Sequence, residues 1–168
     1  DSNRRAVGAL EAALSLQDAF VAVADRVFPR VVGSRPAVPQ GSTFELFKTS
    51  YSAAFKKDAS TLSFVPHSYD AAWLTFYGSA WALRQAKRLD GTAIAQGLRK
   101  VSAGGPEIAV TPANWTKVID AFGAGNAVNL VGASGTLDYD PKTEETTGLI
   151  NIWKISADGK SIDGVTVR

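Results

Sequence analysis

The stretch PHSYDAAWLTFYGSAWALRQAKRLD, residues 66–90, predicts one long amphipathic helix, because its apolar residues recur at helical spacing. Gly91 follows it and predicts its end. The preceding TLSFV, residues 61–65, is rich in β-branched and aromatic residues and predicts a short strand. In open α/β proteins, ligands bind where a strand ends and the next helix begins. The sequence therefore predicts a ligand contact at the first turn of this helix.

Four side chains gather at that first turn and are the candidate ligand-binding residues: His67, Ser68, Tyr69 and Asp70. A helix N-terminus offers unpaired N–H groups and a partial positive charge to a docked ligand. Tyr69 adds a flat ring face and a hydroxyl. His67 taken alone fits better a residue that simply flanks the helix start than a ligand contact.

The rest of the chain alternates between helical and extended patterns. Helices are predicted over 5–27 (one or two), 43–57, 93–102 and 112–123, with Thr92 as a cap before the third of these. Strands are predicted over 28–33, 126–136, 149–155 and 162–167, the last two joined by a turn at Asp158-Gly159. This order predicts an α/β fold, with a parallel sheet flanked by helices and a C-terminal β-hairpin outside that sheet.

The composition excludes several classes of site. The chain has no cysteine and one histidine among 168 residues, which removes disulfide frameworks, zinc knuckles and polyhistidine metal sites. Its net charge is +2 and its basic pairs are isolated, so no nucleic-acid interface is expected. The acidic residues between 138 and 145 lack the ligand order of a calcium loop, so we expect no metal site. No apolar run is long enough to span a bilayer, and no secretory signal is present.

No catalytic motif is present either. The segment GAGNAVNLVGASG, residues 123–135, has neither dinucleotide-fingerprint spacing nor a phosphate-loop lysine. Ser134 lacks the G-x-S-x-G context of a nucleophile elbow. We therefore expect no enzymatic activity and no cofactor.

Several pieces, in order, resemble a known family over roughly residues 28–157. They are Tyr69-Asp70-Ala71, Leu98-Arg99-Lys100-Val101, Val131-Gly132-Ala133-Ser134-Gly135 running into Leu137-Asp138-Tyr139-Asp140, and Ile152-Trp153. Their order and spacing are similar to the C-terminal half of a type I periplasmic binding protein. The closer likeness is to the branched-chain amino acid (Leu/Ile/Val-type) receptors of ABC importers.

The resemblance implies two α/β lobes with a ligand in the cleft between them. Residues 1–36 would supply the end of one lobe and a crossing, 37–130 the second half of the other lobe, and 131–168 a last crossing and terminal strands. Tyr69-Asp70 corresponds to a ligand-facing position. Gly132, Ser134 and Gly135 would form a hinge, because two close glycines permit unusual backbone angles. A complete receptor would be about twice this length, so we expect a fragment that self-associates.

The resulting expectation is the solute-binding component of an ABC importer. It would bind a small polar solute, such as an amino acid, and deliver it to a membrane permease. The location would be periplasmic or anchored to the cell envelope. The alternative is a ligand-sensing regulatory domain of the same fold in a signalling protein.

Overall fold

A computed structural model describes residues 30–102, 105–140, 142–143, 145–146, 148–156 and 161–167. The chain divides into two compact units. Unit 1 combines the start of the chain, up to Arg35, with residues from Ile150 onward, and unit 2 is Pro36–Leu149. The predicted helices within 5–27 and the turn at Asp158-Gly159 lie outside the described residues.

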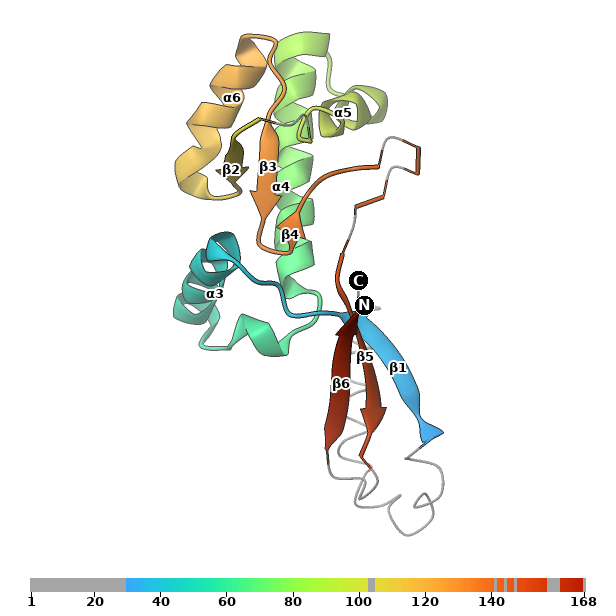
Figure 1. Ribbon diagram of the computed structural model, residues 1–168. Coiled ribbons are helices and arrows are strands. Elements are labelled where there is room, and N and C mark those ends of the chain that lie inside the picture. Colours follow the sequence, from blue (N-terminus) through green and yellow to red (C-terminus); the bar gives the residue numbers. More distant parts are fainter. Residues whose placement is uncertain are drawn as a thin grey trace. The chain divides into compact units, whose positions relative to one another are not determined.

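Unit 1 contains a three-stranded sheet in the order β1-β5-β6 (Figure 1). Its strands are β1 (Val32–Pro36), β5 (Ile150–Ile155) and β6 (Ile162–Val167). β5 and β6 pair antiparallel, with Ile150 opposite Val167 and Ile155 opposite Ile162. The predicted C-terminal hairpin strands are confirmed, and they belong to a different sheet from the strands of unit 2.

Unit 2 contains a second small sheet, in the order β2-β3-β4. β2 (Glu107–Ala109) and β3 (Asn129–Gly132) run parallel, and β4 (Gly135–Thr136) folds back antiparallel on β3. The helices of this unit are α3 (Ser42–Phe55), α4 (Val65–Trp81), α5 (Gly91–Leu98) and α6 (Trp115–Gly123). The predicted α/β class is therefore confirmed, whereas the predicted parallel sheet is parallel only between β2 and β3, because β4 is antiparallel. None of the helices in the described part of the chain is long and apolar enough to cross a membrane.

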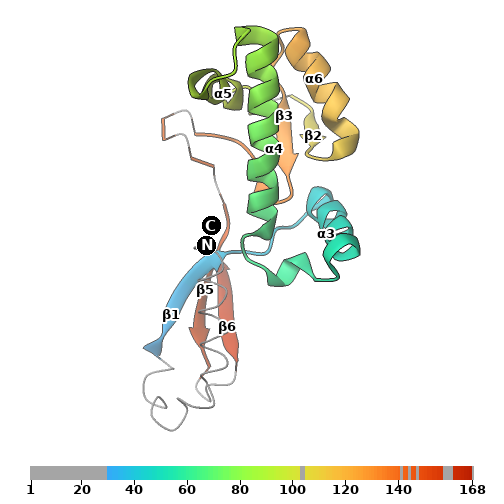
Figure 2. The same cartoon turned by 180° about the vertical axis from the view of Figure 1, so that it is seen from behind.

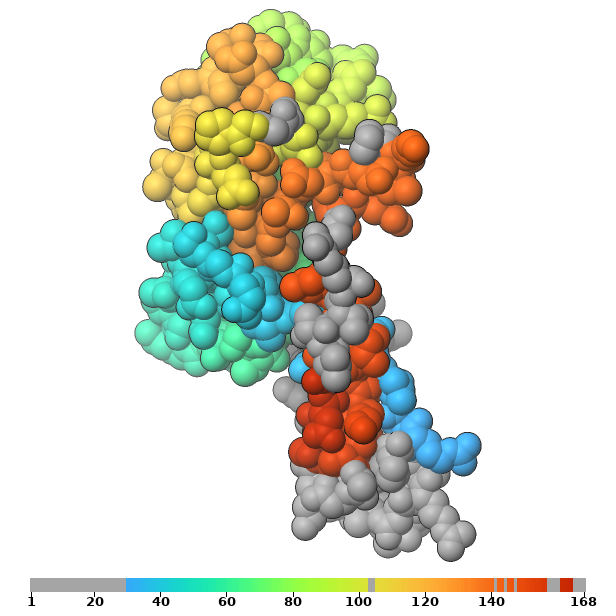
Figure 3. All heavy atoms as spheres, viewed as in Figure 1, coloured from blue at the N-terminus to red at the C-terminus, as the bar shows by residue number. Residues whose placement is uncertain are grey.

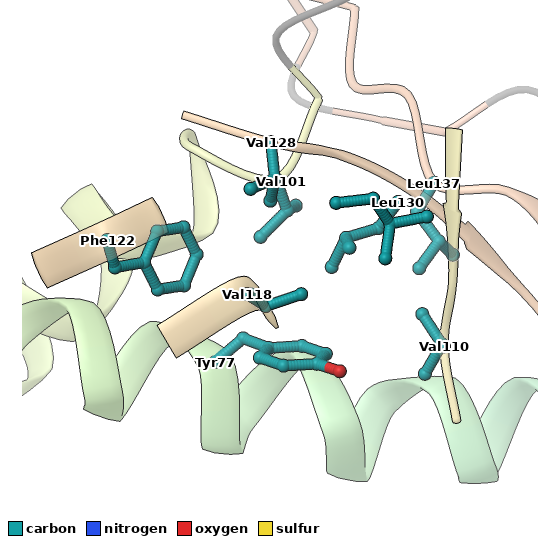
Figure 4. Close-up of a cluster of buried hydrophobic side chains, with 9 residues drawn as sticks. Tyr77, Val101, Val110, Val118, Phe122, Val128, Leu130 and Leu137 are labelled. Atoms are coloured by element: carbon teal, nitrogen blue, oxygen red, sulfur yellow. The ribbon is translucent and has the colours of Figure 1, made fainter. Parts of the chain in front are cut away.

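The main core of unit 2 lies between α4, α6 and the sheet. From behind, α4 lies in front of the strands (Figure 2), and in the space-filling view from the opposite side it is largely hidden (Figure 3). Alternate sheet residues, among them Ile108 and Leu130, are buried in this core. Tyr77 of α4 lies at its centre together with Val118 and Phe122 of α6 (Figure 4). Burial raises the pKa of Tyr77 to about 12.

The predicted strand at 61–65 is wrong. Ala59–Thr61 form a 3₁₀ turn capped by Asp58, whose carboxylate accepts the Ser60 N–H at 2.9 Å. The N–H groups of Leu62 and Val65 then donate to the carbonyls of Ala59 and Leu62. These backbone groups are satisfied within turns, so the segment has no need of a neighbouring strand.

The long helix begins as predicted but ends earlier. α4 continues into a π-helical turn, Ala82–Ala86, and stops at Lys87, whose φ of 56° is left-handed. Gly91 does not end this helix but begins α5. Asp90, rather than Thr92, caps α5, because its side chain accepts the Ala93 N–H at 2.9 Å.

Candidate functional site

The N-terminal part of α4 lies at the carboxyl ends of the two parallel strands, which Tyr69 and Asp70 contact from its second turn. The Tyr69 hydroxyl donates to the carbonyl of Val110, the residue after β2, at 3.4 Å. Asp70 bonds to Ala133 and Ser134, which directly follow β3. This is the edge of a parallel sheet where α/β proteins bind ligands. The start of α4 therefore lies at the kind of sheet edge that the sequence predicted, although the strand predicted to precede α4 is absent.

Asp70 is a structural acceptor and does not face solvent, contrary to the prediction that it contacts a ligand. Its side chain is 2 % exposed. Oδ1 accepts the Ala133 N–H at 2.8 Å, and Oδ2 accepts both the N–H and the hydroxyl of Ser134 at 2.6 Å. Three donors therefore already occupy both carboxylate oxygens.

The Asp70 carboxyl group packs directly against the backbone of Gly132. A Cβ atom on Gly132 would overlap the Asp70 carboxyl group, so a side chain at Gly132 would displace it. Burial raises the pKa of Asp70, and the hydrogen bonds from Ser134 and Ala133 together with nearby His67 oppose that rise. This carboxylate thus joins the α4 N-terminus to the turn after β3.

Tyr69 is half-buried. Its ring lies 4.8 Å from that of Phe47 in α3 and 6.2 Å from that of Trp73, measured between centroids. Burial raises the pKa of its hydroxyl, so Tyr69 is a neutral hydrogen-bond donor. Of the four candidates, Tyr69 best combines a fixed ring with partial access.

His67 and Ser68 differ in what they offer. The Ser68 side chain is exposed, and its hydroxyl donates back to the Phe64 carbonyl at 3.0 Å. His67 is half-buried, and its Nδ1 atom is buried with no hydrogen-bond partner among the described residues. The helix terminus offers few donors, because Pro66 has no N–H and the N–H groups of Val65 and Ser68 bond to Leu62 and Phe64.

Helix α3 also contributes to this edge, which was not predicted from the sequence. Its Phe44 and Phe47 side chains are buried against Ala133 and half-buried Tyr69. The sequence predicted only a helix over 43–57, and residue spacing does not say which residues the buried face of a helix meets. Phe47 therefore restricts one side of the candidate site.

The hinge residues are placed differently from the prediction. Gly132, Ser134 and Gly135 form the β3–β4 hairpin inside unit 2, with Gly132 paired to Gly135. Gly135 has a φ of 126°, a backbone angle that favours glycine. Asp70 ties this turn to α4, so the segment is held within one unit instead of running between two. The boundaries between the units fall at 35–36 and 149–150.

The site contains acceptors, donors and ring faces but no grouping suited to a metal. In the described part of the chain, no three His, Asp or Glu side chains are close enough to hold a metal ion. No protein-family model, curated protein or solved structure matches the chain. The groups left at this edge are the half-exposed Tyr69 side chain and the buried Nδ1 of His67, which has no hydrogen-bond partner among the described residues.

Proposed function

We propose that this chain is the C-terminal portion of a bilobed solute-binding receptor. The receptor binds a small polar solute, such as an amino acid, and delivers it to the membrane permease of an ABC importer. Its location is periplasmic or at the cell envelope. Tyr69 provides the ring and hydroxyl contact from this side of the cleft, and no covalent step is involved.

One observation carries the proposal: the N-terminal part of α4 lies at the carboxyl ends of β2 and β3, with Tyr69 partly accessible there. The order of sequence pieces similar to the type I periplasmic binding proteins supports it. The separation of the terminal strands from unit 2 is compatible with strands that return to another lobe. In this proposal the two units belong to the two lobes of the receptor.

The same architecture also serves a second candidate function, ligand sensing in a signalling protein. The rest of the longer protein distinguishes the transport function from the sensing function. A transport receptor carries an export signal and binds a permease, whereas a sensor carries an effector domain. Copurification of the longer protein with a membrane permease would favour transport.

The test is calorimetric titration of amino acids into the longer protein that the resemblance implies. Tyr69→Ala should weaken binding of the solute by about 2 kcal/mol, roughly 30-fold, because an aromatic contact residue is lost. The matched control is Tyr139→Ala. Tyr139 is also half-buried, and its backbone N–H donates to the Ser102 hydroxyl, which places it near the start of β3 and away from the candidate site. Equal losses in both variants, or no loss in Tyr69→Ala, would contradict the proposal.

A further inference from the structure

The end of unit 2 opposite the candidate site has an uneven distribution of charge. Residues 83–100 include five cationic residues and one acidic residue, so this stretch has a net charge of +4, whereas the whole chain has +2. All six charged residues are exposed. They are Arg84, Lys87, Arg88, Arg99, Lys100 and Asp90. The basic pair at 87–88 is therefore part of a wider cationic region.

The fold gathers these residues at one end of unit 2. The C-terminal ends of α4 and α6 lie there together with α5 (Figures 1 and 2). The Gln85 side chain, in the π-helical turn after α4, donates to the last carbonyls of α6, and the Val128 N–H donates to the Lys100 carbonyl. The turn that connects these two contacts, residues 123–127, is exposed and uncharged. Cations from before and after α5 therefore border the same surface.

Two exposed leucines flank the first three of these cations. Leu83 is 54 % exposed and Leu89 is 58 % exposed. Cations at helix C-termini also complement the helix dipoles, but that role needs no neighbouring leucines. Large apolar side chains among Lys and Arg are typical of segments that lie at a membrane interface. The apolar groups enter the boundary of the acyl chains there, while the cations meet anionic headgroups.

We propose that this cationic end of unit 2, with Leu83 and Leu89, binds the surface of a lipid bilayer that contains anionic lipids. The net positive charge selects a partner of opposite charge. The leucines select a bilayer over a nucleic acid, because phosphate groups are bound by Lys and Arg and provide no contact for an apolar side chain. This inference goes beyond solute binding and does not depend on it.

The test is cosedimentation of the whole chain with large unilamellar vesicles. Vesicles that contain phosphatidylglycerol should bind the chain and release it at high salt, whereas vesicles of phosphatidylcholine alone should not bind it. Lys87→Gln combined with Arg88→Gln should weaken binding about 25-fold, at roughly fivefold for each cation.

The matched control is Lys56→Gln combined with Lys57→Gln. It removes the same charge from an exposed position at the end of α3, beside Phe55, which is 61 % exposed. It should leave binding nearly unchanged, because charges more than a Debye length from the bilayer are largely screened. Circular dichroism checks that both double variants keep their helices.

A second measurement uses the absence of native cysteine. Leu89→Cys and Phe55→Cys each place a single thiol at an apolar position of similar exposure, 58 % and 61 %. With the polarity-sensitive dye NBD on the thiol, phosphatidylglycerol vesicles should shift the emission to the blue at position 89 and leave it unchanged at position 55.

Three results would overturn the proposal: no binding to phosphatidylglycerol vesicles, equal loss of binding in the two double variants, or equal blue shifts at the two labelled positions. Displacement of the vesicles by duplex DNA would assign the surface to a nucleic acid and would overturn it as well.

Discussion

At the scale of single residues, Asp70 should be the most sensitive polar position of unit 2. Asp70→Ala leaves the N–H groups of Ala133 and Ser134 without their acceptor in a buried turn. Each such group costs about 1–3 kcal/mol, so we expect the free energy of unfolding to fall by about 3–5 kcal/mol. Urea unfolding followed by circular dichroism measures this change.

Asp140 provides the control for that substitution. Its carboxylate also accepts two backbone N–H groups, from Lys142 at 2.7 Å and Thr143 at 3.1 Å, but it is exposed. Water can replace it as acceptor, so Asp140→Ala should cost less than about 1 kcal/mol. Similar losses in both variants would show that the burial of Asp70 has no energetic consequence.

The raised pKa of Asp70 also sets a pH dependence. Burial makes the charged form less favourable in the folded state than in the unfolded chain, so the folded pKa lies above the ordinary 3.8. The contribution of Asp70 to stability should therefore be largest below that ordinary value and decline as the pH rises through the folded pKa. The difference in unfolding midpoint between wild type and Asp70→Asn across this pH range measures it. A difference that instead grows as the pH rises would contradict the assigned direction.

The burial of Asp70 was readable from the sequence, but its partners were not. Positions 70, 73 and 77 lie on one side of a helix, so Asp70 shares the inward face of Trp73 and Tyr77. Its hydrogen-bond donor Ala133 is 63 residues away along the chain. Local spacing carries no information on such distant pairs, which is why a structural acceptor was interpreted as a ligand contact.

At the scale of elements, the crossing of α4 and α5 depends on two glycines. A Cβ atom on Gly97 would lie 2.7 Å from the Gly78 carbonyl oxygen and 3.1 Å from the Trp81 Cβ. Gly97→Ala must therefore push the two helix backbones apart, and we expect a loss of about 1–3 kcal/mol in the free energy of unfolding, the usual cost of overpacking. Thermal or urea unfolding measures it.

Gly91→Ala is the companion variant in the same helix. No atom lies within 4 Å of a Cβ atom placed there. Alanine at this first position of α5 should be neutral or add up to about 1 kcal/mol, because it restricts the unfolded chain. If Gly97→Ala were as well tolerated as Gly91→Ala, close approach of the helices would not be what requires glycine at position 97.

Helices α3, α4 and α6 were predictable because their apolar spacing extends over several turns. The five residues 61–65 were not, because β-branched composition in a short run does not reveal whether a partner strand exists. The outcome there was decided by Asp58 and by local carbonyls that accept the N–H groups of Leu62 and Val65. The conformation of a short segment depends more on which hydrogen-bond partners are available than on the strand propensity of its residues.

At the scale of the whole molecule, unit 2 is a continuous segment, whereas unit 1 draws strands from both sides of it. All members of the two buried clusters lie between residues 36 and 149. The ends of that segment are also tied together, because the Ala37 N–H donates to the Leu149 carbonyl at 2.9 Å. These features indicate that unit 2 contains what it needs to fold.

We therefore expect residues 36–149 alone to keep their helical circular dichroism and to unfold cooperatively. The midpoint should lie within about 5 °C of the helical transition of the whole chain, the shift that roughly 1 kcal/mol produces.

The comparison is the shorter segment 37–130, which ends where the sequence predicted a lobe boundary. It lacks Leu137 from the main core and both partners of the Asp70 carboxylate, so the buried charge would be unpaired. This shorter segment should show no cooperative transition. Equal stability of the two segments would mean that unit 2 folds without the β3–β4 hairpin and that the hydrogen bonds of Asp70 do not stabilise it.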